Sequence, residues 1–290
     1  MHRFSLNGKR SDTAGWCLLF EDGRGGVFGD FRIGLSSVWT AQRREQMTPT
    51  ERANIARQLA QANAQRQDQQ RQQWAVNAQR NAALWAQTVP VTDGDPVSLY
   101  LQRRGLAGPV PDHLRLHPGL TYWDGGDCGT WPAMVAPLVR PDGIGLALHR
   151  TYLTADGCKA QVSTVKKLTS ASGPLAGACI PLHEPQGGVI GIAEGIETAQ
   201  AAHLASGLPT VAAYCAGNLA AYIWPADVSR LVVFADADPA GAAAAQSLRA
   251  RALRAGLRVA VMTPSRPGAD WCDVWAQRDA VSVNASESAA

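Results

Sequence analysis

The residues best suited to chemistry are carboxylates that follow apolar runs in the C-terminal third of the chain. Carboxylates held close together repel one another, so they favour either protonation or a bound cation. Hard oxygen ligands of this kind suit Mg²⁺ or Mn²⁺. We therefore predict a divalent-metal site, whose candidate ligands are Glu194, Asp236, Asp238, Asp270 and Asp273.

These acids have to be positioned by a regular alternation of strands and helices. The pattern predicts strands at 188–193, 210–214, 230–235 and 257–262, with helices near 196–206, 217–223 and 240–255. Such alternation implies a parallel sheet with helices on its faces, and such sheets bind ligands at the carboxyl ends of their strands. We expect all the acids to share that edge. For any one of them alone, the simpler explanation is a helix N-cap.

Other nucleotide and metal sites are disfavoured by the sequence. No G-x-G-x-x-G loop follows a predicted strand, and no Walker A motif occurs, so dinucleotide and P-loop sites are not expected. A phosphatase with an Asp-x-Asp nucleophile would leave Glu194 without a role. The six cysteines include no C-x-x-C pair and none lies near a histidine at metal-ligand spacing, so a zinc ribbon is not expected either.

Composition fits an ordinary globular protein. The chain has 290 residues, of which 46% are hydrophobic and 18% charged, and its formal net charge of +3 is too small to indicate a partner by itself. No run approaches the roughly 18 apolar residues that cross a membrane. The N-terminus lacks the apolar stretch of a signal peptide. We therefore expect a cytoplasmic protein without membrane contact.

Upstream of the acids, the composition changes twice. Residues 1–45 are rich in Gly and aromatic residues and predict a small antiparallel β module. Residues 46–89 are rich in Arg, Gln and Ala and predict a long helix, which begins at a Thr-x-x-Glu capping box (48–51) and breaks near Asp68. This helix is interpreted either as a solvated linker or as a basic arm along nucleic-acid phosphates.

The remaining chain is divided into three further parts. Residues 90–186 predict a β-rich module with a short helix at 97–104 and strands at 133–139 and 145–153. Residues 187–277 form the predicted strand–helix domain described above. Residues 278–290 are rich in Ser and Ala and predict a disordered tail.

Three motifs resemble those of Toprim domains, the metal-binding fold of bacterial DnaG-type primases, topoisomerases and certain nucleases. They are Ala193-Glu194-Gly195-Ile196-Glu197-Thr198-Ala199, Asp236-Ala237-Asp238-Pro239-Ala240-Gly241 and Asp270-Trp271-Cys272-Asp273. The resemblance covers about residues 90–276 and is closest to the Toprim primases of phages and plasmids. It implies a Rossmann-like Toprim sheet preceded by a mixed α+β primase-core subdomain.

The resemblance also implies an activity. A primase of this type synthesises short primers on single-stranded DNA from nucleoside triphosphates with Mg²⁺ or Mn²⁺, and a separate helicase unwinds the duplex. Glu194 then takes the role of the conserved acid, and Asp236 and Asp238 bind metal, with Asp270 and Asp273 as further metal candidates. The implied contacts to nucleotide or template are Arg150, Lys159, Lys166 and Lys167. The alternative for these basic residues is a solvated hairpin surface.

The chain departs from this family at its N-terminus. Most primases of this type carry a zinc ribbon there, and here the aromatic β module takes its place. Its aromatic residues either stack on bases of single-stranded DNA or form the core of the module; they are Trp16, Phe28, Phe31 and Trp39. Two other functions stay open: a Toprim nuclease that hydrolyses phosphodiester bonds, and a non-catalytic DNA-binding accessory of replication or transfer.

Overall fold

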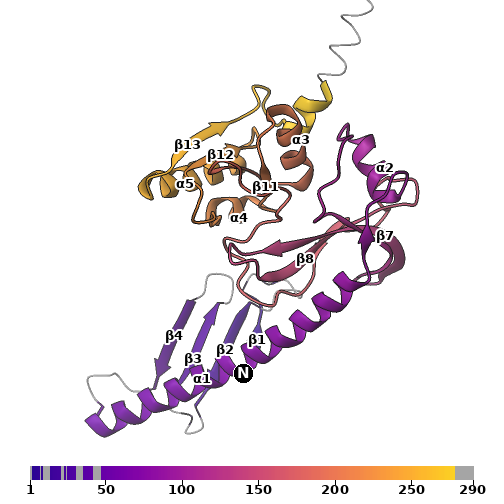
Figure 1. The fold of residues 1–290 in the computed structure, drawn as a ribbon. Coiled ribbons are helices and arrows are strands. Elements are labelled where there is room, and N and C mark those ends of the chain that lie inside the picture. Colours follow the sequence, from indigo (N-terminus) through magenta and orange to yellow (C-terminus); the bar gives the residue numbers. More distant parts are fainter. Residues whose placement is uncertain are drawn as a thin grey trace, which may run out of the picture. The chain divides into compact units, whose positions relative to one another are not determined.

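The computed structural model describes residues 2–6, 8, 14–20, 23, 25–30, 35–41 and 47–277 (Figure 1). The predicted tail and Phe31 lie outside the described residues. Tertiary contacts divide the chain into two compact units, residues 1–73 and 74–290, and helix α1 (Pro49–Ala86) contributes residues to both. The five-part division expected from the sequence stays a prediction.

The first unit is built on a four-stranded antiparallel sheet. The strands follow one another in the order β1 (His2–Phe4), β2 (Gly15–Leu19), β3 (Gly25–Asp30) and β4 (Leu35–Thr40). Because side chains alternate between the two faces of a strand, the sheet presents two different surfaces. One surface packs on α1, and the other carries exposed apolar residues.

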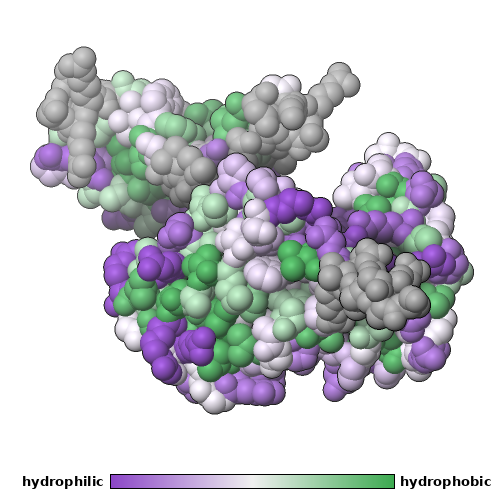
Figure 2. Space-filling model, turned by 90° about the horizontal axis from the view of Figure 1, so that it is seen from above, coloured by the Kyte–Doolittle hydropathy of each residue, from purple (hydrophilic) through white to green (hydrophobic). Residues whose placement is uncertain are grey.

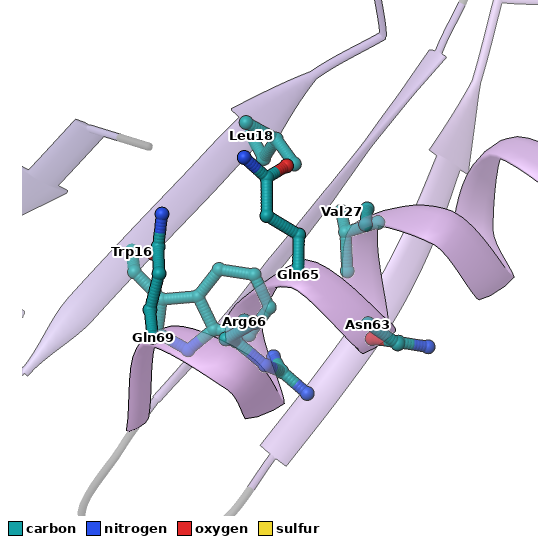
Figure 3. A pocket seen from close by; sticks show the side chains of 8 residues that line it. Trp16, Leu18, Val27, Asn63, Gln65, Arg66 and Gln69 are labelled. Carbon is teal, nitrogen blue, oxygen red and sulfur yellow. The ribbon is translucent and has the colours of Figure 1, made fainter. Parts of the chain in front are cut away.

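The face toward α1 contains the small core of this unit. Trp16, Phe20 and Val27 are buried there and pack against Ile55 and Leu59 of the helix. Trp16 therefore belongs to the core and does not stack on a ligand. Figure 3 shows the pocket beside it, where the Arg66 guanidinium lies 4.6 Å from the centroid of the Trp16 ring.

The opposite face of this sheet carries large apolar side chains that are exposed to solvent. Leu19, Gly26 and Trp39 are paired across three strands, and Phe28 lies two residues beyond Gly26 on the same face. Phe28 and Trp39 expose 43% and 46% of their surface. Trp16 is therefore a core residue, whereas stacking of Phe28 and Trp39 on bases stays a prediction.

Helix α1 is continuous over 38 residues, so the break predicted near Asp68 is wrong. The segment contains no internal Gly or Pro, and Asp68 forms an ion pair with Arg71 along the helix surface. The predicted capping box is present, because the Thr48 amide donates to Glu51 at 2.8 Å and the Glu51 amide donates to the Thr48 hydroxyl at 3.2 Å. Helix propensity and this cap outweigh the single acidic residue.

The second unit begins with a five-stranded antiparallel sheet. It contains β5 (Val89–Pro90), β6 (Arg115–Asp124), β7 (Asp127–Val139), β8 (Gly145–Tyr152) and β9 (Lys166–Leu168), in that order. Strand β6 was not predicted, because His117-Pro118-Gly119 interrupts its pattern and the register shifts there. Helix α2 (Pro96–Arg103) begins at the N-cap Asp95, whose Oδ1 atom accepts two backbone N–H groups of the first turn.

The predicted strand–helix alternation is confirmed as a parallel sheet with helices. Its strands lie in the order β11, β10, β12, β13, and all three pairings are parallel. Figure 1 labels β11, β12 and β13. The elements are β10 (Val189–Ala193), α3 (Ile196–Ser206), β11 (Thr210–Ala212), α4 (Ala216–Ala221), β12 (Arg230–Phe234), α5 (Pro239–Arg254) and β13 (Arg258–Met262). Residues 271–277 add a further helical segment.

One continuous core joins the two sheets of the second unit. Met134 of β7, Leu101 of α2, Ile196 of α3 and Phe234 of β12 belong to the same buried cluster. The antiparallel sheet is therefore fixed against the parallel sheet by apolar packing, which is the main favourable term in folding. On the face shown in Figure 2, hydrophilic and hydrophobic residues are interspersed, as is usual for the surface of a folded protein.

Two further observations complete the fold. All six cysteines lie in the described part of the chain and are free thiols. Over the described residues, none of the helices combines the length and the apolar character that crossing a membrane requires.

Candidate metal and nucleotide site

The acidic residues lie at the carboxyl ends of two adjacent parallel strands. In the register of β10 and β12, Ala193 pairs with Phe234. Glu194 is the residue after one of these strand ends, and Asp236 is the second residue after the other. The sheet topology therefore brings together two acids that are 42 positions apart in the sequence.

The third acidic segment is attached to the same edge by backbone hydrogen bonds. The Ala237 amide donates to the carbonyl oxygen of Ala269 at 2.9 Å, and the Gly268 amide donates to that of Ala237 at 2.7 Å. These bonds place Asp270 next to the Asp-x-Asp loop. Gly241 is required by the same loop, because a Cβ atom there would lie 2.8 Å from the carbonyl oxygen of Asp236.

Asp236 has the most unfavourable environment of the five acids. Burial, followed by repulsion from the neighbouring carboxylates, raises the pKa of Asp236 to about 6. The repelling residues, in decreasing order, are Glu194, Asp270, Asp238 and Asp273. The Oδ1 atom of Asp236 is buried and has no hydrogen-bond partner within the described part of the chain.

The charge of Glu194 is also disfavoured by burial and by a neighbouring carboxylate. Its side chain is partly buried, and burial together with repulsion from Asp238 raises its pKa. The backbone N–H of Ala216, at the start of α4, donates to the carboxylate and opposes this shift. Glu194 is therefore held by α4 at the centre of the strand edge, with a proton affinity above that of an ordinary glutamate.

The other three acids have local structural partners. Asp238 is the N-cap of α5 and accepts the Gly241 amide at 2.7 Å. Asp270 and Asp273 cap the final helical segment reciprocally, with the Asp273 amide 2.8 Å from Asp270 Oδ1, and Asp273 also lies 3.5 Å from Arg266. Helix capping thus explains why these three carboxylates stand where they do. It does not explain the buried carboxylate of Asp236, which caps none of the described helices.

These observations test whether a divalent cation fits the edge. Among the residues that the structure describes, no three His, Cys, Asp or Glu side chains form a ready-made ligand cluster. The buried Oδ1 of Asp236 lacks a partner, however, and four carboxylates raise the pKa of that side chain. A cation would relieve both conditions, so the donor set fits Mg²⁺ or Mn²⁺, which prefer carboxylate oxygens.

The predicted basic residues lie on β8, on β9 and in the loop between them, and three of the four have defined partners. Lys166 forms an ion pair with Glu197. Lys167 donates to the carbonyl oxygen of Trp123 at 2.8 Å and lies 3.4 Å from Asp124. Arg150 donates to the carbonyl oxygen of Leu168 at 2.8 Å and to the Tyr152 hydroxyl at 3.2 Å, while Lys159 is an exposed side chain.

Two residues that belong to this region were not predicted as site residues. Glu197 was quoted only as part of a motif, and Tyr100 was not singled out. Their hydrogen bond joins positions that are 97 residues apart, so no local spacing indicates it. The sequence does not set Glu197 apart either, because an acid in the first turn of a helix is common.

Comparison with known proteins supports part of the expected relationship. Residues 189–280 match the family model of the Toprim domain, and residues 75–180 match a domain of unknown function, DUF7146. The Toprim resemblance of the C-terminal segment is therefore confirmed. No curated protein matches the chain.

Several solved primase structures are similar to the chain at low identity. A DNA primase domain from Pseudomonas aeruginosa is 16% identical with a TM-score of 0.38, over 57% of this chain and 55% of that chain. A DnaG primase catalytic domain bound to single-stranded DNA is 14% identical with a TM-score of 0.48, over 72% and 78%. The Aquifex aeolicus primase with zinc-binding and RNA polymerase domains is 13% identical with a TM-score of 0.45, over 95% and 75%. The chain thus spans about half the length of the Pseudomonas domain.

Proposed function

We propose that this protein is a DNA primase that synthesises short primers on single-stranded DNA from nucleoside triphosphates. We assign nucleotidyl transfer to the acidic edge of the parallel sheet, and nucleotide or template contacts to the basic residues of β8, β9 and the loop between them. The acidic edge consists of Glu194, Asp236, Asp238, Asp270 and Asp273. The observation that carries the proposal is the environment of Asp236: a buried, unpartnered carboxylate oxygen among four other carboxylates.

The cation is assigned to Asp236, Asp238 and Glu194, with Asp270 and Asp273 as additional ligands. A bound Mg²⁺ or Mn²⁺ would activate the attacking hydroxyl and neutralise charge on the leaving pyrophosphate. The remaining chemistry belongs to the chain's own residues.

Glu194 has a second role in this proposal. In primer extension the 3′-oxygen of the primer bonds to the α-phosphorus of the nucleotide, the bond to the β-phosphate oxygen breaks, and pyrophosphate leaves. The hydroxyl proton needs an acceptor. We assign this role to Glu194, which directly follows β10 at the same edge, because a carboxylate within reach of the hydroxyl can accept its proton.

Arg150, Lys159, Lys166 and Lys167 are assigned to phosphates of the nucleotide or of the template. Basic side chains that contact phosphates supply most of the sequence-independent affinity for nucleic acids. We also propose that the protein acts in replication of the phage or plasmid type and that a separate helicase unwinds the duplex. Both parts of this proposal are implied by the motif resemblance.

One incubation separates this function from its rivals. Single-stranded DNA, labelled nucleoside triphosphates and Mn²⁺ are mixed with the protein, and the products are resolved on a denaturing gel. New template-dependent oligonucleotides support the primase. Shortened template instead indicates a nuclease that uses water in place of the 3′-hydroxyl, and a band that shifts only on a native gel indicates a binding accessory.

A further inference from the structure

A buried glutamate between the two sheets of the second unit has no role in the chemistry described so far. The Glu197 side chain is 7% exposed. The Lys166 ammonium lies 2.9 Å from each of its two carboxylate oxygens, and the Tyr100 hydroxyl donates to Oε1 at 2.5 Å. Side chains from β9, α2 and α3 therefore meet at one carboxylate.

The surroundings shift the pKa values of Glu197, Tyr100 and His149, each in one direction. Burial raises the pKa of Glu197, but attraction to Lys166 and hydrogen bonds from Tyr100 and Lys166 outweigh it and lower the pKa to about 2. Burial and the neighbouring carboxylate raise the pKa of Tyr100, so its hydroxyl stays protonated and donates. Burial and repulsion from Lys166 lower the pKa of His149 to about 4, so the nearby imidazole is neutral.

The junction lies directly beside the acidic edge. Glu197 Oε2 lies 3.6 Å from the position that a Cβ atom on Gly195 would occupy, so its carboxylate folds back toward the start of α3. Gly195 is the residue next to Glu194. The Lys166 ammonium is therefore tied, through the Glu197 carboxylate, to the first turn of α3, which begins two residues after Glu194.

The two partners of this ion pair differ in exposure. The Lys166 side chain is 42% exposed, whereas Glu197 is almost completely enclosed. Here the acceptor is fixed inside the protein, and the ammonium is partly open to solvent, where a ligand phosphate can reach it.

We propose that Glu197 is a positioning residue, which holds the Lys166 ammonium where the β- and γ-phosphates of an incoming nucleoside triphosphate bind. This inference rests on the proposed function. A free lysine side chain samples many rotamers, and a fixed carboxylate restricts that freedom before the nucleotide arrives. Tyr100 fixes the carboxylate in turn, so residues from three elements determine where one positive charge lies.

The test compares Lys166→Met, Glu197→Gln and the double variant in the full chain. Binding of a fluorescent ATP analogue with Mn²⁺ is measured at equilibrium, and KM and kcat are measured where primer synthesis occurs. We expect Lys166→Met and Glu197→Gln each to raise Kd and KM about tenfold, with kcat changed by no more than about threefold. Because Glu197 acts through Lys166, the double variant should match Lys166→Met alone.

Controls separate positioning from stability. Arg140→Met removes an exposed ion pair with Asp142, on the turn between β7 and β8, and should leave Kd and KM unchanged. Lys166→Arg keeps the charge and should recover most of the affinity. If Glu197→Gln does not fold, Tyr100→Phe removes only a hydroxyl from the same junction and is expected to raise Kd about threefold.

Two results would overturn the inference. One is a lowered unfolding temperature in Glu197→Gln with triphosphate affinity unchanged, and the other is additive losses in the double variant. Failure of the proposed function is distinguishable, because it appears as a wild-type protein that makes no oligonucleotides. The equilibrium binding measurement decides the role of Glu197 in that case as well.

Discussion

Asp236 is an acidic side chain whose negative charge is strongly disfavoured in the folded protein. Its folded pKa of about 6 lies above the usual aspartate value, because burial and four neighbouring carboxylates disfavour its charge. The folded protein therefore binds a proton there more tightly than the unfolded chain does. Stability is lost as the pH rises from about 4 to about 6, and the full penalty is present at neutral pH without metal.

Asp236→Asn is predicted to stabilise the metal-free protein. The substitution removes a repelled carboxylate, so the free energy of unfolding at pH 7.5 should rise by about 1–2 kcal/mol, after allowance for partial exposure. The gain should vanish at pH 4, where the wild-type residue is protonated. Urea titrations in EDTA at the two pH values measure it. A variant that is less stable at pH 7.5, or a gain that is independent of pH, would contradict the assigned electrostatics.

Among the structural elements, the strands of the parallel sheet were predictable and the environment of α3 was not. Apolar runs followed by acids identify the ends of β10 and β12, because buried parallel strands have that pattern. The burial of Glu197 depends on Tyr100, which comes from α2 and is close only in the folded chain. The overlooked β6 contains a proline and a glycine, and the continuous α1 shows that one acidic residue does not end a helix.

The N-terminal sheet shows the same limit of prediction. The sequence indicates that alternate residues face opposite ways, but it does not tell which face α1 covers. The structure places Trp16 against the helix and leaves Phe28 and Trp39 exposed on the other face. Residues 1–73 contain eleven Lys and Arg and seven Asp and Glu, a balance that is compatible with binding a polyanion.

Trp39→Ala is predicted to weaken binding of single-stranded DNA. Stacking of one base on an aromatic ring contributes about 1–3 kcal/mol, so the Kd for a labelled oligonucleotide should rise at least about fivefold in fluorescence anisotropy. Leu19→Ala is the matched control, because Leu19 is 69% exposed on the same face and has no ring. Equal affinities of Trp39→Ala and wild type would assign this face another role.

For the molecule as a whole, the acidic edge should couple metal binding to folding. A ligand that binds only the folded state stabilises it by about 2.7 kcal/mol at one hundred times its Kd. We therefore expect saturating Mn²⁺ to raise the unfolding temperature of the wild-type protein by several degrees, since about 1 kcal/mol shifts it by 2–4 °C in a domain of this size.

The same Mn²⁺ titration on Asp236→Asn supplies the comparison. This variant lacks the central ligand and should show less than about half of the wild-type shift. Arg140→Met, which lies outside the site, should respond as the wild type does. An equal shift in Asp236→Asn would show that Mn²⁺ binds elsewhere.

The central claim is that the acidic edge catalyses the synthesis of a primer on a DNA template. The most direct measurement is incorporation of labelled nucleoside triphosphates on single-stranded DNA with Mn²⁺, by the wild-type protein and by Glu194→Gln, whose fold is verified by circular dichroism. We predict template-dependent oligonucleotides from the wild type and at least about a hundredfold fewer from Glu194→Gln, which loses an acidic ligand and the base. Equal incorporation by the two proteins, or shortened template without new strands, would contradict the account.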